Sequence, residues 1–257
     1  MRTTVALPRR LLAEFVGTAL LVTAVVGAGI MAQRLSPGQV GQQLLYDSVA
    51  TAFALGALIL TFGPVSGAHF NPVVSAADWF LGRRDRTGLT ATDLAGYIAA
   101  QTTGAIGGSV LANLMFAEPA VAMSRTDRAG GGLWLGELVA TAGLVLLIFA
   151  LARSGRATAA PAAVGAYIGA AYWFTSSTSF ANPAVTIGRA FTDTFAGIAP
   201  ASVPAFVSAQ LTGLACALAL LAALYPHPSH TAGKPVTAPA PAAVNGDGQG
   251  QHDQRHR

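Results

Sequence analysis

Six long apolar runs restrict this chain more than any other feature of its sequence. They cover residues 11–32, 44–64, 92–116, 133–152, 160–177 and 203–224. A helix of about 20 apolar residues crosses the hydrocarbon core of a bilayer, and a helix satisfies its backbone polar groups within a single segment. The first run is too long for a signal peptide and contains an acid, Glu14. We therefore predict an all-α membrane protein with six transmembrane helices.

The composition agrees with this class and excludes others. Hydrophobic residues make up 53% of the 257-residue chain and charged residues only 10%. The one cysteine cannot form an internal disulfide. We find no cluster of metal ligands and no group of residues that calls for a cofactor. The basic residues are too scattered to indicate a nucleic-acid partner, so the expected partner is the lipid bilayer.

The distribution of lysine and arginine predicts the orientation. With six spans, one side of the membrane receives eleven of the fifteen basic residues and the other receives four. Because cytoplasmic loops carry the excess of basic residues, we expect both termini in the cytoplasm of a cell that carries the protein in its plasma membrane. The four residues on the outer side are Arg34, Arg125, Arg128 and Arg189.

A short phrase occurs twice, each time after an apolar run. It reads Asn71-Pro72-Val73 first and Asn182-Pro183-Ala184 second. Asparagine is a preferred N-cap and proline is favoured at the first helical position. Each phrase therefore predicts a loop that enters a helix, over 72 to about 80 and over 183 to about 191. At 1.5 Å per residue each helix is about 13 Å long, about half of the bilayer core.

The two phrases belong to a longer internal repeat. Glu14, Asn71 and Gln101 correspond in order to Glu137, Asn182 and Gln210. Repeat one covers about 11–116 and repeat two about 133–225. Since three spans per repeat is an odd number, the second copy must be inverted relative to the first. Inverted repeats with interrupted helices are typical of transport proteins, with the site near the membrane midplane.

Two Asn-Pro boxes in a six-span inverted repeat resemble the major intrinsic protein family of aquaporins and aquaglyceroporins. The resemblance implies a helical bundle with two re-entrant half-helices that meet in mid-membrane, assembled as a homotetramer with one pore per subunit. The first box ends in Val73, where the family more often has alanine. We expect residues 1–10 to be a cytoplasmic N-terminus, 11–225 the channel domain, and the Pro/Gly/Gln-rich residues 226–257 a disordered cytoplasmic tail.

The predicted pore lining is neutral. Two helix N-termini that face each other place positive dipole ends against the path, a field that repels cations and protons. The amides of Asn71 and Asn182 can donate to a permeating hydroxyl. Loop carbonyls can accept from it, and the candidates are Gly67, Ala68, His69, Ser179, Phe180 and Ala181.

Polar residues inside the spans have two interpretations. A carboxylate at membrane depth is costly and suggests function, so Glu14 and Glu137 are either a proton relay or braces that accept from loop N–H groups. We favour braces, which is also the role that the resemblance implies. Gln101 and Gln210 are expected to form hydrogen bonds between helices. His69 is either a pH gate or, as we favour, the partner in a fixed hydrogen bond.

Four positions set the narrowest point in this family, and one is usually an arginine three residues after the second asparagine. Val185 stands there in this chain. Counting back without gaps predicts Thr51, Ala170 and Ser179 as the other three. This set has no aromatic residue, histidine or arginine. It resembles the bacterial aquaglyceroporins associated with arsenic resistance, which implies passage of neutral metalloid hydroxides such as arsenite, of glycerol and of water.

Arg189 complicates this prediction. It lies four residues after Val185, on the same helix face. The side chain is either solvated or facing lipid headgroups, or it supplies the missing guanidinium to the filter from outside.

Three rival functions remain. A water-selective pore differs only in solute. A coupled secondary transporter also uses inverted repeats, but it would place an ionisable group beside the substrate, and the predicted lining has only amides, carbonyls and hydroxyls. An intramembrane enzyme would need a nucleophile with a base or a metal site, and we see neither in the spans.

Overall fold

The computed structural model describes residues 5–83 and 85–225. In this part of the chain the six predicted spans form helices close to the expected bounds. The long helices are α1 (Leu7–Leu35), α2 (Val40–Ser66), α4 (Ala91–Met115), α5 (Gly131–Arg153), α6 (Ala160–Phe174) and α8 (Val203–Leu224). Four of them, α1, α2, α5 and α8 with its preceding turn, are long and apolar enough to cross a membrane by themselves. The predicted tail at 226–257 lies outside the described residues.

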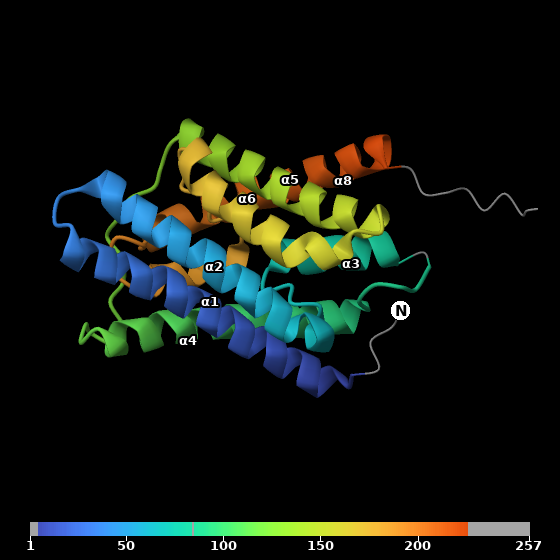
Figure 1. Cartoon of the computed structure of the whole chain (residues 1–257), viewed down its shortest axis with the longest axis horizontal. Helices are drawn as coiled ribbons and strands as arrows, with labels where there is room; N and C mark the ends of the chain where they lie inside the picture. Colours follow the sequence, from blue (N-terminus) through green and yellow to red (C-terminus); the bar gives the residue numbers. More distant parts are fainter. Residues whose placement is uncertain (1–4, 84, 226–257) are drawn as a thin grey trace, which may run out of the picture. The chain divides into compact units, whose positions relative to one another are not determined.

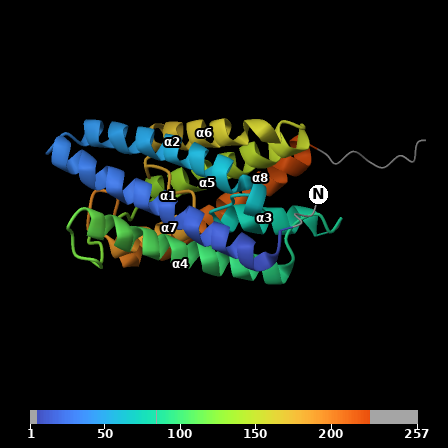
Figure 2. The same cartoon turned by 60° about the horizontal axis from the view of Figure 1, so that its bottom comes forward.

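The two predicted half-helices are present between the long ones. Helix α3 (Pro72–Gly82) follows the first box, and α7 (Pro183–Gly188) follows the second and continues as a 3₁₀ turn, Arg189–Phe191. The long helices lie side by side along one axis (Figure 1). From the centre of the bundle, α3 runs toward the end where α1 begins and α7 runs toward the opposite end (Figure 2). The fold is therefore the predicted bundle of six helices and two re-entrant halves.

Glycines allow the closest helix crossings. A Cβ atom at Gly104 in α4 would lie 2.4 Å from the backbone oxygen of Phe15 in α1. Its repeat mate Gly213 in α8 would place a Cβ 2.6 Å from the oxygen of Leu138 in α5. Small residues of this kind let membrane helices approach closely. The crossings bring α1 and α4, and likewise α5 and α8, behind the two boxes.

Candidate functional site

The two asparagines cap the half-helices as their sequence predicts. Asn71 has extended backbone, and its side-chain oxygen accepts from the N–H of Val73 at 3.0 Å. The Asn182 oxygen accepts from Ala184 and Val185 at 3.0 and 3.2 Å. The prolines stand at the first helical position, where the missing N–H costs nothing. These residues and the rest of both boxes, Pro72, Val73, Pro183 and Ala184, are buried.

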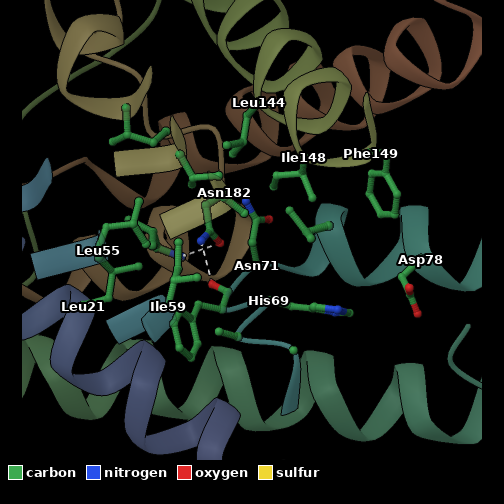
Figure 3. A pocket seen from close by; sticks show the side chains of 18 of the residues that line it. Leu21, Leu55, Ile59, His69, Asn71, Asp78, Leu144, Ile148, Phe149 and Asn182 are labelled. Atoms are coloured by element: carbon green, nitrogen blue, oxygen red, sulfur yellow. Dashed lines mark hydrogen bonds between the residues drawn. The ribbon is translucent and has the colours of Figure 1, made fainter. Parts of the chain in front are cut away.

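Each asparagine amide also reaches across to the other box. Asn71 Nδ2 donates to the Ala181 oxygen at 2.8 Å, and Asn182 Nδ2 donates to the Phe70 oxygen at 2.7 Å. Figure 3 shows the two side chains next to each other. A side-chain amide has two N–H groups, so one of them on each asparagine is not needed for this cross-link. The two oppositely directed helix starts therefore meet at one place.

The approach to each box has an unusual backbone. Ala68 and Phe70 before the first, and Thr178, Ser179 and Ala181 before the second, have positive φ angles. Non-glycine residues rarely adopt this region, so such loops need support from their surroundings. The turns also direct successive loop N–H groups to the same side of the chain, toward two buried carboxylates.

Glu14 binds the first loop. Its Oε1 accepts from the Ser66 hydroxyl at 2.6 Å and from the His69 N–H at 3.0 Å. Its Oε2 accepts from the Phe70 N–H at 2.7 Å and from the Gln101 amide at 2.8 Å. The carboxylate is fully buried, and each of these contacts is with a donor.

Glu137 repeats the arrangement in the second half. It accepts from the N–H groups of Phe180 and Ala181, both at 2.8 Å, and from the Gln210 amide at 2.6 Å. Each glutamine then donates to a hydroxyl in the half-helix, Gln101 to Ser75 and Gln210 to Thr186, at 2.9 Å. The inverted repeat therefore supplies one carboxylate, one glutamine and one hydroxyl behind each loop.

A cavity of about 260 Å³ reaches the asparagine pair. Its lining includes Asn71 and Asn182, and most of the remainder is apolar side chains and the backbone of the first loop. Of the six loop residues that the sequence suggested, Gly67, Ala68, His69 and Phe180 line it, whereas Ser179 and Ala181 do not appear in the lining. Asp78 lies at one end of this lining (Figure 3). It also lines a second hollow of about 410 Å³, together with Arg10 and Asp93.

His69 is held in place within this lining. Its Nδ1 lies 3.0 Å from the Ser75 hydroxyl, and its ring packs 5.4 Å from that of Tyr97.

The structure changes the predicted set of filter positions. Val185 lines the cavity, and Thr51 and Ser179 are buried. Ala170, however, is exposed on the outer face of α6, on the same stripe as Trp173. The prediction of Ala170 as a pore residue is wrong, because a count without gaps through the loop before Asn182 selects the outward face of the helix.

The residue that α6 directs toward Thr51 is Tyr172. The two hydroxyls lie 3.2 Å apart, and Tyr172 is only 3% exposed. The sequence analysis missed this tyrosine, although an aromatic residue two positions after Ala170 in an apolar run was the available signal. The expectation of a region without aromatic residues therefore does not hold.

Arg189 is not solvated. Its side chain is 2% exposed, its Nε donates to the Ala196 oxygen, and its guanidinium carbon lies 3.5 Å from the centre of the Phe180 ring. Arg128 approaches the same ring at 5.0 Å. Burial lowers the pKa of Arg128 to about 10, so this loop guanidinium stays charged at neutral pH. The interpretation of Arg189 as a solvent-facing or headgroup-facing side chain is wrong.

Comparison with known proteins agrees with this geometry. The family model described as "Major intrinsic protein" matches residues 1–181. The chain therefore belongs to the major intrinsic protein family, whose members are multi-pass membrane channels for small solutes, not enzymes.

Individual members of the family are similar to the chain over most of its length. The chain is 51% identical over 215 residues to aquaglyceroporin AqpS of Rhizobium meliloti, covering 84% of this chain and 89% of that one. It is 34% identical over 193 residues to a probable TIP-type aquaporin of Medicago truncatula, covering 70% and 73% of the two chains. The X-ray structure of the Plasmodium falciparum aquaglyceroporin has the same fold, with a TM-score of 0.64 at 20% identity and coverage of 86% and 97%.

Proposed function

We propose that the protein is a passive channel for small neutral solutes that carry hydroxyl groups, such as glycerol and metalloid hydroxides including arsenite, as well as water. The observation that carries this proposal is the pair of crossed asparagine caps at the cavity wall. Two helix N-termini there oppose cations, while the free amide N–H groups can donate to a neutral solute. Glu14 and Glu137 have the role of braces in this proposal.

Val185 supports a solute larger than water. An arginine at this position would add a fixed charge and several donors to the wall of the passage. Valine lines the cavity without either. A relative that shares half of its residues with this chain is named an aquaglyceroporin, which favours polyol passage over strict water selectivity.

Swelling of proteoliposomes tests the proposal. Vesicles with the wild-type chain are expected to swell in glycerol and in arsenite without any ion gradient, and Val185→Arg is expected to reduce solute flux at least tenfold while water flux falls less. Swelling in water alone would identify a water-selective pore. Dependence on a proton or sodium gradient would identify a coupled transporter and contradict the proposal.

The assembly and location belong to the same proposal. Large hydrophobic side chains such as Phe53, Leu60 and Trp173 are exposed on the outside of the bundle, where lipid or neighbouring subunits would cover them. We infer a homotetramer in the plasma membrane with both termini in the cytoplasm. Cross-linking in native membranes and protease accessibility of terminal tags would test the two parts separately.

A further inference from the structure

Three residues lie where two hollows of the molecule meet. Gly67, His69 and Asp78 line both the cavity that reaches the asparagine pair and the second hollow of about 410 Å³. The asparagines line only the first hollow, whereas Arg10 and Asp93 line only the second. The three shared residues therefore mark the junction of the two hollows, which we call the throat. In Figure 3 His69 lies between the asparagine pair and Asp78.

Asp78 brings a carboxylate to the throat. It lies in α3, seven residues after Asn71, which at 1.5 Å per residue is about 10 Å further along the half-helix. Its Oδ2 accepts from the Leu89 N–H at 2.8 Å. Among the described residues no donor is bound to its Oδ1, and the side chain is only half-buried. The structure thus presents one uncommitted acceptor oxygen at the junction of the hollows.

No basic side chain pairs with this carboxylate in the described part of the chain. Arg10 lines the second hollow, but its guanidinium pairs with Asp93 at 3.3 Å. Arg83, at the end of α3, stacks on the Phe80 ring at 3.9 Å and lines neither hollow. Asp78 is therefore an acid without an ion-pair partner, and the neutral lining that the sequence predicted has this exception.

The asparagine pair has the opposite electrostatic character. Two helix N-termini meet there, and their positive ends oppose cations but favour anions. This field alone would leave unopposed the anions that weakly acidic solutes form. A carboxylate further along the same half-helix repels such anions. Its field is strong because most of the surrounding cavity wall is apolar, as at Ile148 and Phe149.

We propose that Asp78 is a specificity-determining residue that excludes anions at the throat. The passage then distinguishes a neutral polyol or metalloid hydroxide from an anion of similar size. A neutral solute can donate a hydroxyl to the uncommitted oxygen of Asp78, whereas an anion meets a like charge. The inference rests on the proposed passive channel and adds a selection by the charge of the solute.

Asp78→Asn is the direct test, because it removes the charge and leaves an oxygen that can accept from the Leu89 N–H. Proteoliposomes contain a fluorophore that chloride quenches, and valinomycin lets potassium balance the charge that enters. We expect chloride entry to rise at least about fivefold over wild type, the factor for two like unit charges about 4 Å apart in water. Glycerol swelling is expected to stay within about twofold, since the neutral solute keeps an acceptor. Chloride entry equal to wild type would overturn the proposal.

Two matched controls separate the position of the charge from its presence. Asp78→Glu keeps a carboxylate at the throat. Asp85→Asn makes the same exchange at an exposed acid in the loop after α3, which lines neither hollow. Both variants are expected to exclude chloride as wild type does. Equal chloride entry in Asp85→Asn and Asp78→Asn would contradict the assignment of the effect to the throat.

A purely structural role of Asp78 predicts a different pattern. Asp78→Ala removes both the charge and the acceptor of the Leu89 N–H, and it replaces the asparagine variant if that one does not fold. If the charge excludes anions, the alanine and asparagine variants admit chloride equally. A rise in Asp78→Ala beside a well-folded Asp78→Asn without one would assign the effect to the loop contact and overturn the proposal.

Glycerol swelling of the wild-type vesicles separates this inference from the function on which it rests. Wild-type vesicles that pass no glycerol would refute the proposed channel. Wild-type vesicles that swell in glycerol, together with Asp78 variants that still exclude chloride, would refute only the role of Asp78.

Discussion

The two halves of this molecule are alike behind the boxes and different beyond them. Behind each box stand a glutamate, a glutamine and a hydroxyl with corresponding partners. Seven residues after the asparagine, however, the first half has Asp78 and the second has Arg189. Asp78 lines an open cavity and accepts from the Leu89 N–H at 2.8 Å, whereas Arg189 is packed against Phe180.

This difference separates two tasks. The shared groups hold the strained loops, a task that both halves must perform because both loops turn back inside the bundle. Asp78 and Arg189, which differ between the halves, follow half-helices that run toward opposite ends of the bundle. Symmetry therefore marks the residues that support the two loops, and departures from it mark residues that make the two halves of the passage different.

The largest effects are expected at the two buried glutamates. Glu14→Gln and Glu137→Gln each turn one acceptor oxygen into a donor that faces other donors. We expect each to lower stability by about 3–5 kcal/mol, a fall of roughly 10 °C in the melting temperature. Thermal unfolding in detergent measures this, with Glu118→Gln at the exposed pair with Arg34 as the control. A large loss of stability in only one of the two variants would show that the two glutamates do not have equivalent roles.

The next largest losses of stability are expected at the helix crossings. An added methyl group at Gly104 or Gly213 would press on a backbone oxygen, which cannot move like the end of a side chain. We expect Gly104→Ala and Gly213→Ala each to cost about 2–3 kcal/mol. Gly107→Ala is the matched control, since a Cβ there meets nothing within 4 Å. If Gly104→Ala melts like Gly107→Ala, the close approach of α1 and α4 is not needed.

A smaller and unequal effect is expected at the asparagines. Asn71→Ala and Asn182→Ala both remove a cap and a cross-link, at about 2 kcal/mol in total for each. Asn182 caps two N–H groups and Asn71 caps one, so Asn182→Ala should melt lower by one or two degrees. Calorimetry of the two variants side by side checks the order, and the reverse order would contradict the unequal caps.

The smallest effect is expected at the hydroxyls that the glutamines bind. Ser75→Ala and Thr186→Val each remove two hydrogen-bonded contacts, including one between Ser75 and His69 and one from Thr186 to the Asn182 oxygen. We expect losses of about 1–2 kcal/mol that agree between the halves within about 0.5 kcal/mol. Denaturation of the purified variants measures both, and a neutral result in one half would show that the hydroxyls are not equivalent.

Much of the architecture followed from the sequence because its signals are local or periodic. The apolar runs predicted the six long helices, and each Asn-Pro pair predicted where a half-helix begins. The repeat of Glu14, Asn71 and Gln101 as Glu137, Asn182 and Gln210 predicted an inverted pair of halves. To interpret these signals, one needs only the neighbouring residues and the rule that a backbone inside a membrane must satisfy its own hydrogen bonds.

The surroundings of Thr51 and Arg189 depended on tertiary structure. Whether Ala170 or Tyr172 faces the passage depends on the rotation of α6 about its axis, and one residue changes that direction by about 100°. Arg189 is buried because Phe180 and Ala196, from either side of it in the chain, close around it. Asp47 gave no sequence signal, since a lone acid near a helix end is ordinarily solvated. Only the packing of α2 against α6 brings Asp47, Thr51 and Tyr172 to one place.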